Sequence, residues 1–159
     1  MFDLEVFRTS ISNEDVERVY RNIQYFVDNK VENAYEVMAN GMAKTSNPLI
    51  RNALALALAD VKYEDTVEII IQLLKSEKTE GHRGTLLWAL QSFDYMTHIE
   101  FLYQLVKSSN MELCSNTFTL LEKVSNELPL KIREKIIEDA EETIEVLYDV
   151  IDLLRKDNE

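Results

Sequence analysis

The side chains best suited to catalysis or to metal binding are few in this sequence. His82 and His98 are the only histidines, and neither has a Cys or His neighbour at the spacing of a zinc site. Cys114 is the only cysteine and has no catalytic setting, so we interpret it as a small buried residue. No Gly-rich phosphate loop, nucleophile elbow or Ser/His/Asp set is present. We therefore expect no catalytic residue, no metal and no cofactor, and a protein that is not an enzyme.

Carboxylates are abundant, and their distribution indicates a class of partner. Glu138, Glu142 and Glu145 lie on nearby helical turns, but di-iron bundles need Glu-x-x-His motifs that the chain lacks, so we favour a solvated acidic face. The net charge is −12, and the C-terminal segment 134–159 is rich in acids and poor in bases. This charge opposes nucleic-acid binding and favours a basic protein partner.

The elements that position these side chains are predicted to be helices throughout. With only 3 glycines and 2 prolines, the chain has few residues suited to tight turns. Asn47-Pro48 forms a helix start signal, and apolar residues recur at helical spacing from about residue 13 onward. We found no alternating pattern that predicts a strand. After a first helix capped by Ser12 or Asn13, helices are expected at about 31–44, 48–61, 65–76, 83–93, 97–108, 111–126 and 129–156.

Two segments of the chain repeat each other. The segments 51–76 and 83–108 align from end to end without a gap, and more than a third of the aligned positions are identical. Identical pairs include Leu54/Leu86, Leu58/Leu90 and Glu68/Glu100. A fixed period that covers a pair of helices is typical of an α-solenoid, in which each hairpin buries its apolar faces against its neighbours.

The whole chain, 1–159, is predicted to form one all-α domain of about four helical hairpins. We expect an N-terminal cap pair at 13–44, repeats at 47–76 and 79–108, a degenerate repeat at 110–141 and an acidic capping helix at 142–156. The capping helix is predicted to turn five apolar residues inward: Ile144, Leu147, Tyr148, Ile151 and Leu154.

The stretch from Asn47 to Leu54, together with Ala57 to Val61, resembles the first helix of a HEAT-like repeat of the phycobilisome-lyase type. The resemblance covers residues 47–108 well and 110–140 loosely, and it implies a short α-α superhelix. The stretch from His82 to Leu90 also resembles small acidic bacterial repeat proteins that serve as immunity partners of secreted toxins.

The resemblance implies that the second helix of each repeat lines a concave surface. Polar side chains at equivalent positions would then form a ladder facing a partner; the alternative is a solvated helix face that two copies share by duplication. The partner-binding residues we expect, which include two tyrosines at hairpin turns and two acids near the C-terminus, are Tyr63, Glu64, Asp65, Glu68, Gln72, Tyr95, Glu100, Gln104, Glu138 and Glu142.

Three other side chains are given structural roles. Trp88 aligns with Leu56, so we expect it to fill a gap between repeats. Arg51 and Arg83 start equivalent helices, and we expect each to pair with a neighbouring acid.

The leading hypothesis is a monomeric immunity protein that neutralises a basic toxin, such as a nuclease, through an acidic surface. The alternatives are a non-catalytic scaffold or maturation factor related to HEAT-like bilin lyases, and a HEAT-like DNA-repair enzyme, which would need a basic groove. One cysteine, the absence of a signal peptide and the absence of a long apolar run favour a cytoplasmic protein without membrane or nucleic-acid contacts.

Overall fold

The computed structural model describes residues 2–108 and 110–156, and all regular structure in those residues is helical. Helices of the first half are α1 (Leu4–Ser12), α2 (Val16–Asp28), α3 (Asn33–Lys44), α4 (Pro48–Asp60) and α5 (Thr66–Lys75). Those of the second half are α6 (Gly84–Leu90), α7 (Ile99–Val106), α8 (Met111–Val124) and α9 (Leu130–Lys156). Short 3₁₀ turns, Glu77–Thr79 and Met96–His98, precede α6 and α7.

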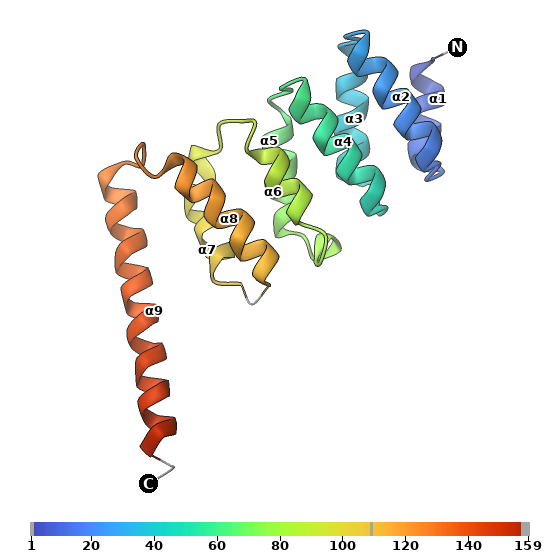
Figure 1. The fold of residues 1–159 in the computed structure, drawn as a ribbon. Coiled ribbons are helices and arrows are strands. Elements are labelled where there is room, and N and C mark those ends of the chain that lie inside the picture. The colour runs from blue at the N-terminus through green and yellow to red at the C-terminus, as the bar shows by residue number, and fades with distance from the viewer. Residues whose placement is uncertain (1, 109, 157–159) are drawn as a thin grey trace.

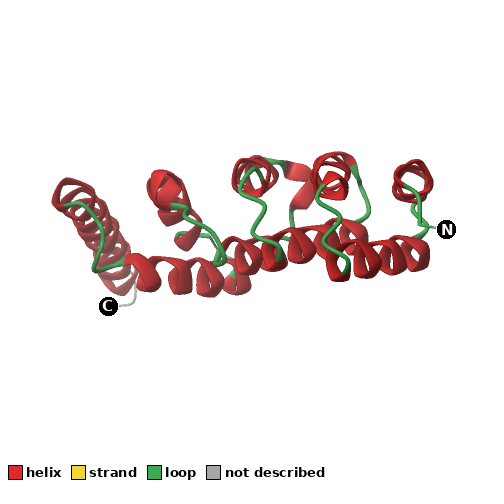
Figure 2. Ribbon diagram, turned by 90° about the horizontal axis from the view of Figure 1, so that it is seen from above, coloured by secondary structure: helices red, strands yellow, loops and turns green. Residues whose placement is uncertain are grey.

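The helices form two parallel layers that run from the N-terminus to the C-terminus (Figures 1 and 2). Helices α2, α4, α6 and α8 pack side by side in one layer, which we call the even layer. The odd layer holds α1, α3, α5, α7 and α9, and hairpin contacts such as α3–α4 and α7–α8 join the layers. This arrangement confirms the predicted short α-solenoid.

The repeated segments occupy equivalent places in the two layers. Helices α4 and α6 are neighbours in the even layer, and α5 and α7 follow them in the odd layer. The side chains that repeat between them are buried in one continuous core, which includes Leu54, Leu58, Ile70, Leu74, Leu86, Leu90 and Leu102. Each large side chain buried in this way contributes roughly 1.5–3 kcal/mol, so packing between helices dominates the stability of the stack.

Side-chain caps fix where several helices begin. The Asn47 carboxamide accepts hydrogen bonds from the backbone N–H of Leu49 (3.0 Å) and Ile50 (3.4 Å), and Pro48 follows it as the first helical residue. Asp15 and Asn110 cap α2 and α8 in the same way. The predicted start of α4 is thus confirmed. The Asn47 side chain supplies an acceptor to backbone N–H groups that have no partner within the helix, and Pro48 has no N–H group that needs one.

Three hairpin turns place residues other than glycine in the left-handed region. Glu14, Lys30 and Lys62 have φ values of 56°, 52° and 52° and follow α1, α2 and α4. After α4, the N–H of Lys62 donates to Ala59 (3.2 Å) and the N–H of Tyr63 donates to Leu58 (3.0 Å), which is the Schellman pattern. The chain therefore turns sharply despite its few glycines.

The first helix was not predicted from the sequence. Asp3 caps α1 by accepting hydrogen bonds from Glu5 N–H (2.7 Å) and Val6 N–H (3.2 Å), and the buried side chains of Phe7 and Ile11 pack on α2 and α3. The N-terminal cap consequently has three helices rather than the two expected at 13–44.

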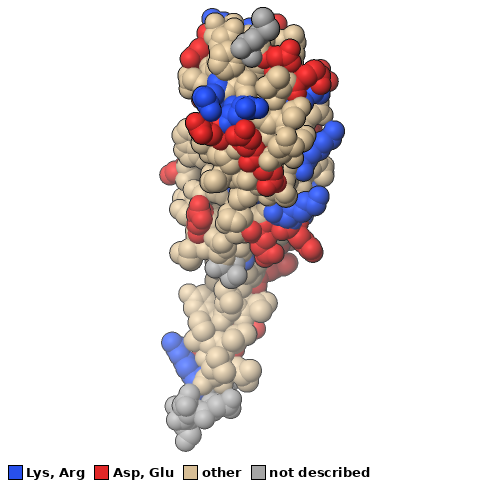
Figure 3. Space-filling view, turned by 90° about the vertical axis from the view of Figure 1, so that its right-hand side faces the viewer, with Lys and Arg blue, Asp and Glu red and all other residues tan. Residues whose placement is uncertain are grey.

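The helix expected at about 129–156 is present as α9, but the expectation that its segment 142–156 forms a separate capping helix was wrong. Helix α9 is continuous from Leu130 to Lys156, and its second half extends beyond the body of the solenoid (Figures 1 and 3). The side chains expected to point inward are all exposed: Ile144, Leu147, Tyr148, Ile151 and Leu154. Nothing between 140 and 142 breaks a helix, because neither glycine nor proline occurs there.

Polar groups in the first half of α9 hold this helix to α7. Lys107 on α7 pairs with Asp139, and Lys135 on α9 pairs with Glu100. Tyr103 is buried between the helices, and burial together with its hydrogen bond to Asp139 raises the pKa of its phenol to about 12. The hydrogen bonds from Lys107 and Tyr103 in turn lower the pKa of the Asp139 carboxyl.

Trp88 also differs from expectation. It is 58% exposed on the outer face of α6, although Leu86, two residues earlier in the same helix, is fully buried. The equivalent residue Leu56 is itself only partly buried, so the repeat preserves an outward position rather than a core position.

We therefore predict that two substitutions on α6 differ strongly in their effect on stability. Leu86→Ala should lower the free energy of unfolding by about 2–5 kcal/mol, because it leaves a cavity between repeats. Trp88→Ala should change it by less than about 0.5 kcal/mol. Urea unfolding followed by circular dichroism measures both. A large loss of stability for Trp88→Ala would show that the indole is part of the core.

A second prediction concerns the contact between α7 and α9 at high pH. The neutral phenol of Tyr103 is favoured in the folded state, so its contribution is complete below pH 10 and is lost as the pH rises through about 12. A tyrosine absorbance titration in the near ultraviolet should show one component near pH 12 that Tyr103→Phe removes, with circular dichroism reporting on folding. If Tyr103→Phe instead removes a component near pH 10, Tyr103 is not bonded to Asp139.

Candidate protein-interaction surface

The polar ladder expected from the repeat lies on the outer surface of the odd layer. Glu68 and Gln72 on α5 are exposed, as are Glu100 and Gln104 one repeat later on α7. Each pair borders a groove between neighbouring helices of this layer. Glu68 and Gln72 line a groove of about 400 Å³ beside α3. Glu100 and Gln104 line one of about 280 Å³ between α7 and α9.

Both ladder acids already have partners within the chain. The Nε2 atom of His98 lies 2.7 Å from Oε1 of Glu68, and Lys135 pairs with Glu100. These contacts join α5 to the turn before α7, and α7 to α9. The ladder therefore contributes less free negative charge than its sequence suggests, and its acids also tie neighbouring repeats together.

Glu138 and Glu142 add negative charge beside the ladder. They lie about one and two helical turns after Lys135, so all three side chains share one face of α9, close to Glu100. Both glutamates are exposed, and neither forms an ion pair within residues 2–108 and 110–156. The C-terminal end of the odd layer is thus its most acidic part.

The turn between α4 and α5 holds three more of the predicted partner-binding residues: Tyr63, Glu64 and Asp65. Glu64 and Asp65 are exposed, and Tyr63 is partly buried with its ring 6.3 Å from that of Tyr35. Burial and a hydrogen bond to Asp65 raise the pKa of the Tyr63 phenol, so it stays protonated at neutral pH. The single hydroxyl proton of Tyr63 is therefore engaged with Asp65 at the edge of this surface.

Tyr95 does not belong to the surface. It is only 2% exposed, and its hydroxyl donates a 2.9 Å hydrogen bond to the carbonyl of Leu120. Burial raises the pKa of this phenol. Tyr95 and Tyr63 are equivalent in sequence, but only Tyr95 is buried, with its hydroxyl bonded to α8. Tyr95 was expected to bind a partner, but its side chain is buried and its hydroxyl is bonded within the chain.

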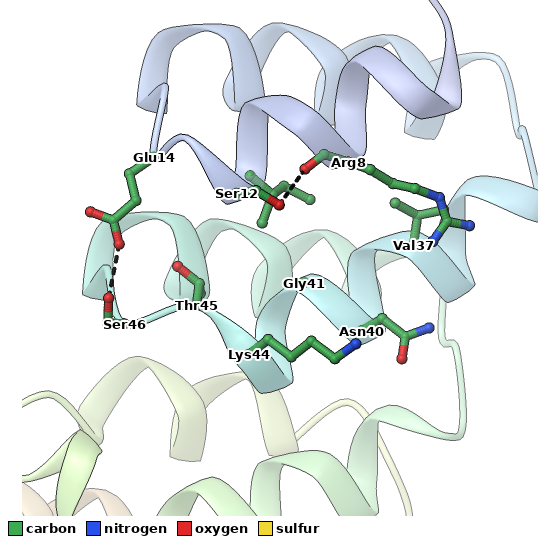
Figure 4. A pocket seen from close by; sticks show the side chains of 10 residues that line it. Arg8, Ser12, Glu14, Val37, Asn40, Gly41, Lys44, Thr45 and Ser46 are labelled. Atoms are coloured by element: carbon green, nitrogen blue, oxygen red, sulfur yellow. Dashed lines mark hydrogen bonds between the residues drawn. The ribbon is translucent and has the colours of Figure 1, made fainter.

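Near the N-terminus, the odd layer is not acidic. A groove of about 460 Å³ between α1 and α3 contains two bases, Arg8 and Lys44 (Figure 4). At its rim, the hydroxyl of Ser46 donates a 2.9 Å hydrogen bond to Glu14, which closes one end. Charge therefore changes along the layer, from mixed at α1 and α3 to acidic at α9.

The even layer has an apolar surface that was not predicted. Tyr20, Leu49 and Trp88 are exposed there, and a groove of about 610 Å³ runs between α2 and α4. Tyr20 and Leu49 line that groove together with Leu56. In the sequence, the only sign of this surface was the recurrence of large apolar residues at the equivalent positions 56 and 88. Repetition alone cannot distinguish an outer position from a core position.

The two arginines do not pair with acids in the part of the chain that the structure describes. Arg83 donates a 3.0 Å hydrogen bond to the carbonyl of Ser76 and a 3.3 Å bond to the hydroxyl of Thr79, which fixes the loop before α6. Arg51 is 1% exposed, and its Nε and Nη2 atoms have no hydrogen-bond partner. Burial lowers the pKa of its guanidinium.

In residues 2–108 and 110–156, no group of three or more His, Cys, Asp or Glu side chains is arranged to hold a metal ion. Cys114 is partly buried on α8 and forms no disulfide. Across these described helices, none combines the length and apolar character that crossing a membrane requires.

Comparison with known proteins identifies the repeats. A family model described as HEAT repeats matches residues 35–127, which include α4 to α8 and most of α3. Searches of curated proteins and of solved structures gave no match. HEAT repeats are protein-interaction or scaffold modules, and the same fold carries many different functions. The match covers more than half of the chain and agrees with the two-layer arrangement of helices, so the protein belongs to the HEAT repeat family.

Proposed function

We propose that this HEAT repeat protein binds a basic protein through the C-terminal part of the odd layer, and that it acts as an immunity protein that neutralises a bacterial toxin such as a nuclease. The observation that carries the proposal is the position of Glu138 and Glu142, exposed and unpaired in the described chain, beside the ladder of α7. The surface also includes Glu64, Asp65, Glu68, Gln72, Glu100 and Gln104, with Tyr63 at its edge.

Charge supports a basic partner. The chain carries a net charge of −12, and more than half of that excess lies in the C-terminal segment 134–159. Opposite charge on a partner would raise the rate of association and make it sensitive to salt. An inhibitor that has to capture a toxin quickly benefits from both properties.

The grooves support recognition by shape. Those beside Glu68 and Glu100 have apolar floors, formed by Ile69 and Leu73 in one and by Phe101 and Ile136 in the other. Apolar side chains of a partner could enter these grooves while its lysines and arginines meet the acidic rims. Glu68 and Glu100 would exchange their internal partners for external ones.

We predict that the protein rescues bacteria from a toxin domain encoded beside its gene, and that Glu138→Gln with Glu142→Gln weakens the complex. At about 0.2–1 kcal/mol per exposed charge pair, the loss of two pairs corresponds to roughly a 2- to 30-fold higher Kd. Surface plasmon resonance with the purified toxin domain at several salt concentrations measures the Kd and its salt dependence.

The control is Glu112→Gln with Glu122→Gln on α8, which makes the same change in net charge in the even layer. This pair should leave the Kd within about 2-fold, because its charges lie outside the proposed surface. Equal effects of the two pairs, a complex whose Kd is independent of salt, or growth arrest despite co-expression would each count against the proposal.

A further inference from the structure

The second half of α9 exposes more apolar surface than an isolated soluble helix normally carries. Ile144, Leu147 and Ile151 are 51%, 57% and 42% exposed, and Val146, Tyr148, Val150 and Leu153 are exposed as well. Viewed from the N-terminal end, this part of the helix emerges from the body with few charges on the visible face (Figure 3). A large exposed apolar patch usually marks an interaction site.

The spacing of these side chains is that of a coiled coil. Ile137, Ile144 and Ile151 recur once per heptad and occupy its position a. Ala140, Leu147 and Leu154 occupy position d of the same heptads. Isoleucine at a with leucine at d favours a parallel, two-stranded coiled coil.

Five acids of α9 are placed where such a pair of helices would leave them in water, whereas Glu141 and Arg155 lie at position e, beside the seam. Glu138, Glu145 and Asp152 occupy position b, and Glu142 and Asp149 occupy position f. Both positions point away from the seam between two helices. Beside the seam at the projecting end are Tyr148 at e and Val150 at g, which are uncharged, so two identical helices meet there without facing acids.

We propose that two copies of this chain associate through their α9 helices, in parallel and in register, along a seam formed by Ile137, Ile144, Leu147 and Ile151. A second copy fits this stripe better than a basic partner does, since the acids lie on the opposite side of the helix. The proposal does not rest on the immunity function, whose acidic surface is the other face of α9 and the outer surface of α7.

The apolar area of the seam is small for a stable dimer interface. A buried Val, Leu or Ile side chain removes roughly 60–120 Å² from water, so the half-exposed seam residues together with Tyr148 and Val150 provide about half of the roughly 800 Å² per partner of a standard interface. We therefore expect a reversible dimer whose fraction rises with protein concentration.

Sedimentation velocity of the full chain over a concentration series tests this directly, without any partner protein. The apparent mass should rise toward twice that of one chain. Leu147→Glu with Ile151→Glu should abolish this rise, because it places charge in the seam. The matched control, Val146→Glu with Leu153→Glu, adds the same charge at exposed position c and should keep it. Circular dichroism checks that both variants remain helical.

A cross-linking experiment tests the orientation independently of stability. In a chain with Cys114→Ser, Ile151→Cys should give a disulfide-linked dimer under mild oxidation, and Leu153→Cys should not. The proposal is overturned if the wild-type chain sediments as a monomer at every concentration or if the seam variant still dimerises. It is also overturned if the control dissociates equally, or if cross-linking is no better at position 151 than at position 153.

Discussion

The structure depends on the burial of apolar side chains that a single helical hairpin cannot hide by itself. Helices α4 and α6 each carry leucines toward the odd layer and further apolar residues toward their neighbours in the even layer. Stacking removes both faces from water, and each added hairpin provides the surface that the next one covers. The polar ladder and the grooves follow from this constraint, because, apart from the buried Arg51, charged side chains of the repeats lie at outward positions.

The same constraint explains the two ends of the molecule. At the N-terminus, α1 covers α2 and α3 with Phe7 and Ile11, so the stack is closed by an ordinary apolar contact. At the C-terminus, α9 is held to α7 partly by Lys107, Asp139 and Tyr103, and its second half extends past the body. Apolar surface therefore remains where the stacking stops, next to the most acidic part of the odd layer.

Much of the fold could be predicted from the sequence, because the repeat and the helix caps are local signals. The alignment of 51–76 with 83–108 identified equivalent helices, and Asn47-Pro48 located the start of α4. Helix α1 was missed although Asp3 provides a cap and Leu4, Phe7 and Ile11 are spaced as an apolar stripe. The division of α9 was imposed by the expected length of a repeat, whereas the residues themselves contain no break.

The candidate surface was less predictable, because burial depends on the neighbouring repeat and not on the residue type. Tyr63 and Tyr95 are equivalent in sequence, yet only Tyr95 is buried, with its hydroxyl bonded to α8. Trp88 lies outside because its position faces away from both neighbours, as that of Leu56 largely does. The pairing of Glu68 with His98 and of Glu100 with Lys135 also joins residues that are far apart in the chain, and no local pattern reports such contacts.

The central claim is that mutual burial between repeats holds the molecule together. The most direct test is to measure the rate of amide hydrogen exchange separately for each helix. At concentrations low enough to keep the chain monomeric, exchange should be slowest in α4, α5 and α6, which lie in the middle of the stack. It should be fastest in α9 beyond Thr143, where residues 144–155 are all exposed. Exchange in α4 and α5 as fast as in the projecting half of α9 would contradict the account, because the central repeats would then gain no protection from stacking.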